Sequence, residues 1–209
     1  KQKVFALEAV ISLIILSLAV GVRAADTEAV MVKDMFPGSL SSRPYLTSVG
    51  STLFFQATNA TAGYELFKSD GTGSGTVMVK DINVGLGSSS PANLTAVGST
   101  LYFQANDGVN GFELWKSDGT DAGTVMVKDI NSGAGNSAPS NLASIGTTIY
   151  FQANDGIYGY ELYKSDGTDA GTVLVKDINL GSANASPSYL SVIGANIYFQ
   201  ADDGIYGQE

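Results

Sequence analysis

In the middle of the chain, apolar residues fall into four short runs separated by turn residues. The runs are Asn93–Val97, Thr100–Ala105, Phe112–Ser117 and Thr124–Ile130. Within them apolar side chains recur at every second position, which is the period of a β-strand, and the segments between them are rich in Gly, Asn and Asp. This pattern predicts an antiparallel meander of four strands. Outside the N-terminal leader, no segment has a helical period.

The same four runs recur at a fixed spacing along the chain. Phe55, Phe103, Phe151 and Phe199 are each 48 residues apart. Between residues 100–131 and 148–179, 26 of 32 positions are identical. A fixed period of about 40 to 50 residues is typical of a solenoid, a propeller or another repeat array.

Four short antiparallel strands per repeat predict an all-β fold, a β-propeller with four-stranded blades of about 48 residues. A β-solenoid is the alternative, but its coils are usually shorter and lack such regular hairpins. The repeats are expected at about 35–82, 83–130, 131–178 and, truncated, 179–209, so the sequence holds nearly four blades. It starts without Met and stops inside a repeat, so we expect a piece of a longer protein with further domains after it.

An additional strand precedes the first repeat. Val30–Asp34 matches Val77–Asp81, the last strand of the first repeat, but no partner strand comes before it in the sequence. Pairing with the third strand of the last repeat would close a ring and remove two open sheet edges.

The N-terminus has the layout of a secretory signal peptide. Two lysines precede the 14-residue apolar run Ala9–Val22, and Val22-Arg23-Ala24 offers a small-x-small cleavage signal. A membrane-spanning helix needs about 20 apolar residues, so a retained anchor is the second interpretation. A prepilin-like leader is the third, although the Gly expected before its cleavage point is missing. We expect residues 1–24 to be the signal peptide and residues 25–209 the repeat region, outside the cytoplasm.

The composition excludes several partners and several kinds of site. The 209 residues include 11 basic and 20 acidic side chains, a net charge of −9, and removal of the leader leaves a net charge of about −11. Such a chain should repel nucleic acid and anionic lipid, so we expect neither a nucleic-acid partner nor membrane insertion after signal cleavage. The sequence has no Cys and no His. This excludes disulfides, thiolate metal sites, Cys nucleophiles, His general bases and the usual His zinc site within it.

One motif lies at the centre of every repeat. Residues 113–120 read Glu-Leu-Trp-Lys-Ser-Asp-Gly-Thr, and the neighbouring copies differ only at the aromatic position, with Phe67 and Tyr163. The motif resembles the ELWxxDGT repeat family of bacterial exported and cell-surface proteins, and the resemblance covers nearly all of Val30–Glu209. It implies a repeat of large, often multidomain surface or secreted chains. It provides no catalytic residues to carry over.

The Asp-Gly pairs of this motif are candidate site residues with a structural interpretation. The pairs are Asp70 and Gly71, Asp118 and Gly119, and Asp166 and Gly167. An Asp before Gly in a hairpin accepts hydrogen bonds from turn amides, and the Gly supplies a positive φ. A catalytic residue needs to occur once per site, so its presence in every copy favours the turn. We therefore expect no catalytic residue and no enzyme activity in this segment.

A second series of acidic loops precedes the third run of each later repeat. Its calcium candidates are Asp107, Asp155, Asp202 and Asp203. Calcium prefers several oxygen ligands, and each loop offers only one or two carboxylates. The first repeat lacks this Asp and reads Asn-Ala-Thr-Ala over residues 59–62. We expect no cofactor, with calcium as the remaining option.

The other polar and aromatic candidates also recur. For Glu65, Glu113 and Glu161 we expect cross-strand pairing with Lys80, Lys128 or Lys176, since nothing in the repeats marks a pair of glycosidase carboxylates. Trp115 and the other regularly spaced aromatics are expected to pack between blades. The candidates for ligand contact are Tyr158 and Tyr206, at loop tips, and Arg43, the only Arg after the leader.

Together these features predict an exported structural or adhesive repeat protein, secreted or at the cell surface. It would present a rigid acidic surface that binds an extracellular protein or glycan. The alternative is a secreted glycan-active enzyme whose catalytic residues lie outside this sequence.

Overall fold

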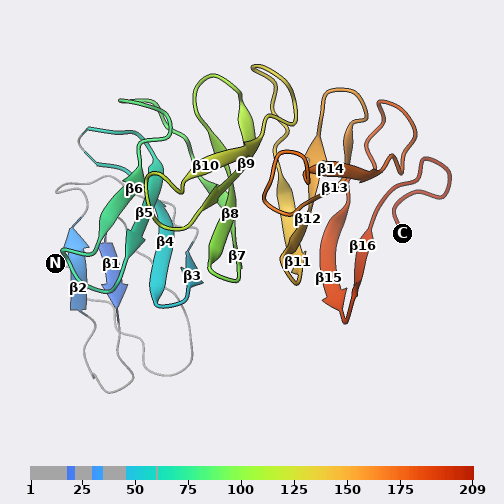
Figure 1. Cartoon of the computed structure of the whole chain (residues 1–209). Coiled ribbons are helices and arrows are strands. Elements are labelled where there is room, and N and C mark those ends of the chain that lie inside the picture. Colours follow the sequence, from blue (N-terminus) through green and yellow to red (C-terminus); the bar gives the residue numbers. More distant parts are fainter. Residues whose placement is uncertain (1–17, 22–29, 35–45, 60) are drawn as a thin grey trace.

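The computed structural model describes residues 18–21, 30–34, 46–59 and 61–209. In these ranges the chain is all-β, with antiparallel sheets and no helix (Figure 1). The first sheet contains β3 (Thr47–Val49), β4 (Thr52–Ala57), β5 (Glu65–Ser69) and β6 (Val77–Lys80). The second contains β7 (Ala92–Val97), β8 (Thr100–Asn106), β9 (Phe112–Ser117) and β10 (Val125–Lys128). The third contains β11 (Ser140–Ile145), β12 (Thr148–Asn154), β13 (Tyr160–Ser165) and β14 (Val173–Lys176).

Two strand pairs flank the three sheets. They are β1 (Leu18–Gly21) with β2 (Val30–Asp34), and β15 (Ser188–Ile193) with β16 (Asn196–Gln200). Each complete sheet is a meander in which sequential strands are neighbours, as the period-two pattern predicts. A search of the described residues finds no helix long and apolar enough to cross a membrane.

The register repeats from sheet to sheet. Phe103 lies opposite Trp115 in the second sheet, and Phe151 lies opposite Tyr163 in the third. The fourth strand is shorter than the sequence suggests, because β10 covers Val125–Lys128 instead of residues 124–130. The amide of Ile130 has left the ladder and donates to a carboxylate oxygen of Glu113 at 2.8 Å. A side chain of the third strand thus replaces the backbone partner and ends the fourth strand.

The hydrophobic core lies between consecutive sheets. Leu101 and Phe103 of the second sheet pack in one cluster with Phe54 and Leu66 of the first. A second cluster joins the second and third sheets in the same way, around the fully buried Phe151. Both faces of the second sheet are therefore buried, which explains its apolar residues on both sides. Truncating one of these phenylalanines to Ala would cost about 3–5 kcal/mol.

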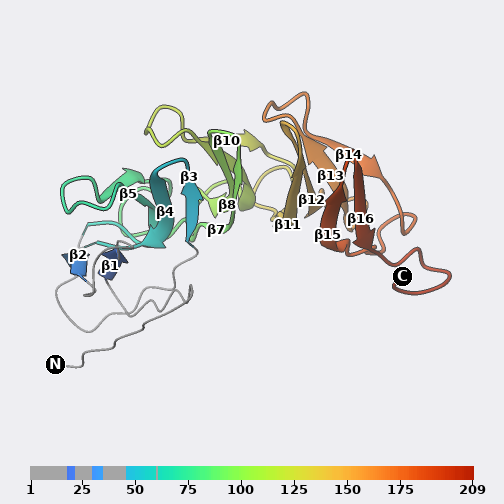
Figure 2. The same ribbon diagram turned by 90° about the horizontal axis from the view of Figure 1, so that it is seen from below.

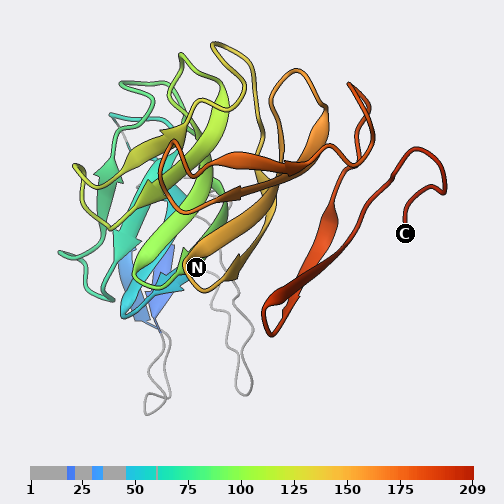
Figure 3. The same ribbon diagram turned by 45° about the vertical axis from the view of Figure 1, so that its right-hand side comes forward.

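The sheets follow one another in sequence order, with their first strands side by side (Figures 1 and 2). Side-chain hydrogen bonds link these first strands. Thr47 donates to the carbonyl of Leu94 at 2.9 Å, and Asn93 donates to the carbonyl of Pro139 at 2.9 Å. The described residues form no closed ring. In Figure 3 the β15–β16 pair stands at one end of the row, with the C-terminal loop beside it.

The additional strand before the first repeat has a different partner from the one the sequence suggests. β2 pairs antiparallel with β1, a piece of the expected signal peptide, and not with the third strand of a later repeat. The lysine of β2 still contacts the first sheet, because Lys33 donates to the carbonyl of Thr76 at 2.7 Å. The rest of the leader lies outside the described residues.

Candidate functional site: turns, loops and the faces between sheets

The Asp-Gly-Thr segment forms a closed turn between the third and fourth strands. Asp118 accepts hydrogen bonds from the amide and the hydroxyl of Thr120, at 2.8 and 2.7 Å. Gly119 has a φ of 87°, in the left-handed region that favours glycine. The hydroxyl of Thr120 in turn accepts from the amide of Gly123 at 2.9 Å. The hydrogen bonds from Thr120 lower the pKa of Asp118, so its carboxylate is kept charged by the turn itself.

The second and third of these turns also lie against the preceding sheet. Lys68 of the first sheet donates to the carbonyl of Gly119 at 2.8 Å, and Lys116 donates to the carbonyl of Gly167 at 2.8 Å. A Cβ on Gly119 would lie 3.2 Å from the ring of Phe54. The motif glycine therefore meets two needs, its backbone angle and its close approach to the neighbouring sheet.

The fourth-strand lysines correct one expectation. Lys80 and Lys128 do not pair with the glutamates of the motif. They form ion pairs with Asp121 and Asp169 of the next repeat, at 3.2 and 3.4 Å. Both acidic side chains are largely exposed, so each pair adds little stability. Their geometry nevertheless shows that lysines of one repeat reach the turn of the next.

The motif glutamate is a buried structural group. Glu113 is 0% exposed and accepts from the amide of Ile130 at 2.8 Å and from the amide and hydroxyl of Ser137 at 3.1 and 2.6 Å. Burial raises its pKa, and these hydrogen bonds only partly oppose the shift. The carboxylate closes the loop that leads to the next sheet, and no solvent or substrate reaches it.

In the third repeat the equivalent glutamate accepts fewer hydrogen bonds. Glu161 accepts from the amides of Ile178 and Ala185, at 2.9 and 3.0 Å. Ala185 stands where the second repeat has Ser137, so the hydroxyl donor is missing. Burial again raises the pKa of the glutamate.

The acidic loops before the third strands use their carboxylates for local turns. Asp107 accepts from the amides of Val109 and Asn110, at 2.9 and 2.8 Å, and from the side-chain amide of Asn110 at 2.7 Å. Burial opposes the change, but these hydrogen bonds lower the pKa of Asp107. Asp155 and Asp203 make the same two backbone contacts, and Asp202 accepts from Gly204 at 2.7 Å. Among the described residues, no three acidic side chains gather where they could hold a metal ion.

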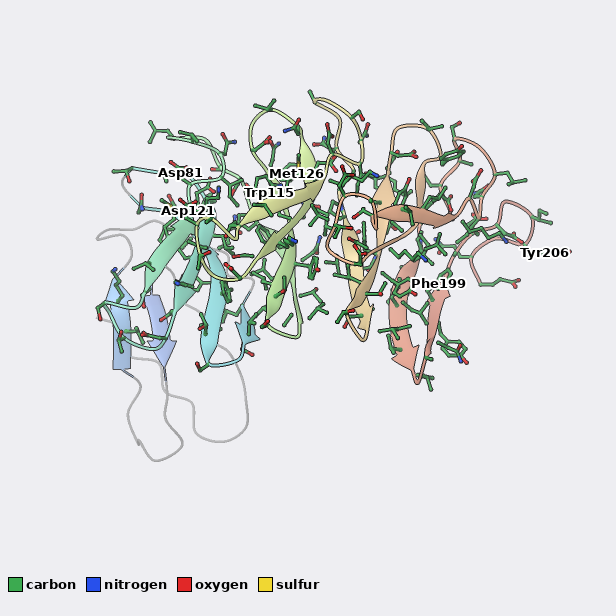
Figure 4. All side chains as sticks on the ribbon, in the orientation of Figure 1. Asp81, Trp115, Asp121, Met126, Phe199 and Tyr206 are labelled. Carbon is green, nitrogen blue, oxygen red and sulfur yellow. The ribbon has the colours of Figure 1, made fainter. Side chains whose placement is uncertain are left out.

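Exposed apolar residues follow these carboxylates at the loop tips. Val109 is 70% exposed, Tyr158 is 37% exposed and Tyr206 is 75% exposed. Figure 4 shows Tyr206 on the loop that leaves β16. The buried Trp115, by contrast, packs beside Met126 between sheets, as expected for the regular aromatics. Arg43, the third candidate for ligand contact, lies outside the described residues.

Two further tip residues of the same kind are exposed, and sequence reasoning missed one of them, Ile205. Ile157 is 64% exposed and Ile205 is 77% exposed. A signal was present, because each is a large apolar residue directly after an Asn-Asp-Gly or Asp-Asp-Gly turn, outside any strand. With Val109, Tyr158 and Tyr206, they form a group of residues that we call the tip residues.

Comparison with known proteins adds little. No family model matches the chain, and no curated protein matches it. A solved structure from a study of two prolyl endopeptidases is similar over 73% of this chain, with 15% identity and a TM-score of 0.47. This chain spans about a fifth of that chain, since the match covers 21% of it.

Proposed function

We propose that this chain is an exported structural or adhesive repeat protein whose sheets are blades of a β-propeller. Three features support the blade arrangement: the four-stranded meanders, the neighbouring first strands and the cores buried between sheets. The signal-peptide pattern supports export, and a chain without Cys needs no oxidative folding.

Binding through the tip residues is the proposed mechanism. The repeated polar groups of the motif are used within the fold, Glu113 in closing a loop and Asp118 in closing a turn. The tip residues, in contrast, are exposed; the second repeat has Val109, and the third and fourth repeats share an Ile-Tyr pair, Ile157 with Tyr158 and Ile205 with Tyr206. Exposed apolar side chains next to fixed carboxylates suit a protein or glycan ligand that offers apolar faces and hydrogen-bond donors. This difference between occupied motif groups and exposed tips is the observation on which the proposal rests.

The test is a binding and hydrolysis screen. The chain is applied to glycan and extracellular-protein arrays, and the same glycans are assayed for cleavage. The proposal expects binding without turnover. Turnover lost on substitution of one non-repeated acidic residue would instead support the glycan-active enzyme. A reporter fused to residues 1–24 tests export separately, and retention in the cytoplasm would contradict it.

A further inference from the structure

The two ends of the three complete sheets carry different charges. The loops between second and third strands, and those between successive sheets, lie at one end, which we call the loop end (Figure 1). The loop end comprises the described residues in 58–64, 81–91, 107–111, 129–139, 155–159 and 177–187. Every charged residue in these ranges is acidic: Asp81, Asp107, Asp129, Asp155 and Asp177. The loop end is therefore a surface of negative charge alone.

The lysines of the same sheets do not neutralise it. Lys68 and Lys116 donate to the carbonyls of Asp-Gly-Thr turns, which lie at the opposite end of the third strands. Lys80 and Lys128 form ion pairs with acidic residues of those turns. Among the described residues these are the only two ion pairs, so no basic side chain is paired with a carboxylate of the loop end.

The fold holds the carboxylates of the loop end in place. Asp81, Asp129 and Asp177 each accept a hydrogen bond from the amide of the glycine four residues on, at 3.0 Å. The other carboxylate oxygen of each is buried and has no hydrogen-bond partner among the described residues. Acidic groups fixed beside protein of low dielectric attract a cation more strongly than the same groups in water. The loop end thus presents fixed and uncompensated acidic groups.

Exposed aliphatic side chains lie among these acidic groups. Val84 and Leu86 are each 83% exposed. The loop of Val84 lies against the loop of the tip residue Val109, since a Cβ on Gly108 would lie 2.8 Å from the side-chain oxygen of Asn83. The equivalent loops of the second and third sheets approach each other as closely. Apolar and acidic groups therefore share one surface that crosses from sheet to sheet.

We propose that the loop end binds a cationic protein segment in which Arg or Lys residues are interspersed with apolar side chains. The basic groups are attracted by the fixed carboxylates, and the apolar groups cover the exposed aliphatic ones. A neutral glycan gains nothing from this charge and finds no aromatic ring at Val84, Leu86 or Val109. The tip residues belong to this surface, so the docking site rests on the proposed function and specifies the chemistry of the partner.

The probe is a labelled peptide in which arginine and leucine alternate with serine and glycine, and its binding to the full chain is followed by fluorescence anisotropy. Asp107→Asn with Asp155→Asn keeps the oxygens that accept from the loop amides but removes both charges. This variant should bind about tenfold more weakly. The matched control, Asp121→Asn with Asp169→Asn, removes two exposed charges from the turns and should change affinity by less than about twofold. Equal losses in both variants, or no binding to the unmodified chain, would overturn the proposal.

A second variant tests the apolar contacts. Val84→Ser with Leu86→Ser should weaken binding of the arginine–leucine peptide about tenfold. It should leave the melting temperature unchanged, because both side chains are exposed. A control peptide with serine in place of leucine should bind more weakly to the unmodified chain and be insensitive to this substitution. Equal binding of the two peptides to the unmodified chain would overturn the proposal, since it would show only general attraction to an acidic protein.

Displacement on the arrays separates this docking site from the proposed function. Extracellular proteins that bind through the tip residues should be displaced by the arginine–leucine peptide. Glycans that bind through Tyr158 and Tyr206, and that the peptide does not displace, would overturn the cationic partner and leave the proposed function standing. Peptide binding by a chain whose array targets do not depend on Tyr158 and Tyr206 would support the docking site and contradict the proposed function.

Discussion

Replacing Glu113 by Ala is the most direct test of the buried hydrogen bonds that this carboxylate accepts. Glu113 is fully buried, and its carboxylate satisfies the amides of Ile130 and Ser137 at 2.8 and 3.1 Å. Each buried amide left without a partner costs about 1–3 kcal/mol, which sets a range of about 2–6 kcal/mol for the two. Removing the charge relieves its desolvation and offsets part of this loss. We expect the substitution to lower the free energy of unfolding by about 3 kcal/mol.

A milder variant is available from the chain itself. Ser137→Ala gives the second repeat the arrangement of the third, where Ala185 stands. It removes only the hydroxyl donor at 2.6 Å and should cost about 1–2 kcal/mol. Ala185→Ser should add a donor to Glu161 and stabilise the chain by a similar amount.

Urea unfolding followed by the fluorescence of Trp115, the only Trp, measures these changes. Asp121→Ala is the control, because its side chain is 76% exposed and the substitution should change stability by less than about 0.5 kcal/mol. A loss below about 1 kcal/mol for Glu113→Ala would refute the reasoning, since two buried amides cannot be left unpaired at so small a cost. A loss for Ser137→Ala equal to that for Glu113→Ala would refute it as well.

Three further outcomes are expected. Gly119→Ala should lower the melting temperature more than Gly71→Ala, because both have a φ near 88° but only Gly119 lies against Phe54; equal losses would contradict this. Burial raises the pKa of Glu113 above its ordinary value of 4.5, so its contribution to stability is present below that pH and is lost as the pH rises through the raised pKa. As the pH rises from 4.5 to 7, the melting temperature should therefore fall less for Glu113→Gln than for the unmodified chain. Millimolar calcium should leave the melting temperature unchanged, because Asp107 and its equivalents are held in local turns; a clear rise would restore the calcium hypothesis.

The strand pattern is where the sequence was most informative. The third strand was expected at Phe112–Ser117 and is found there, and the second begins at Thr100 as expected. Both follow from period-two alternation bounded by glycine turns, which are local properties of the chain. The fourth strand was shorter than expected because Glu113, 17 residues away, takes the amide of Ile130.

Contacts between repeats were beyond sequence reasoning. Lys80 was expected to pair with a glutamate of its own repeat. It pairs instead with Asp121, which lies 41 residues further along the chain. Lys68 reaches Gly119 across 51 residues, a contact that depends on how two sheets pack. Alternation specifies which residues share a face of a strand, but it does not specify which turn the next sheet brings to that face.

The partner of β2 was missed for a related reason. Val30–Asp34 reads as a fourth strand, and any strand with free backbone groups on its edge can pair with it. Sequence pattern does not distinguish a motif strand from the apolar segment Leu18–Gly21, which takes that place in the structure.

The most direct test of the central claim compares the binding of two variants with that of the unmodified chain, on arrays of extracellular proteins and glycans. One variant carries Tyr158→Ala and Tyr206→Ala at exposed tips, and the other carries Asp121→Ala on an exposed turn away from them. We predict that the tip variant loses binding while its melting temperature is unchanged, and that the turn variant binds normally. Undiminished binding by the tip variant would contradict the account.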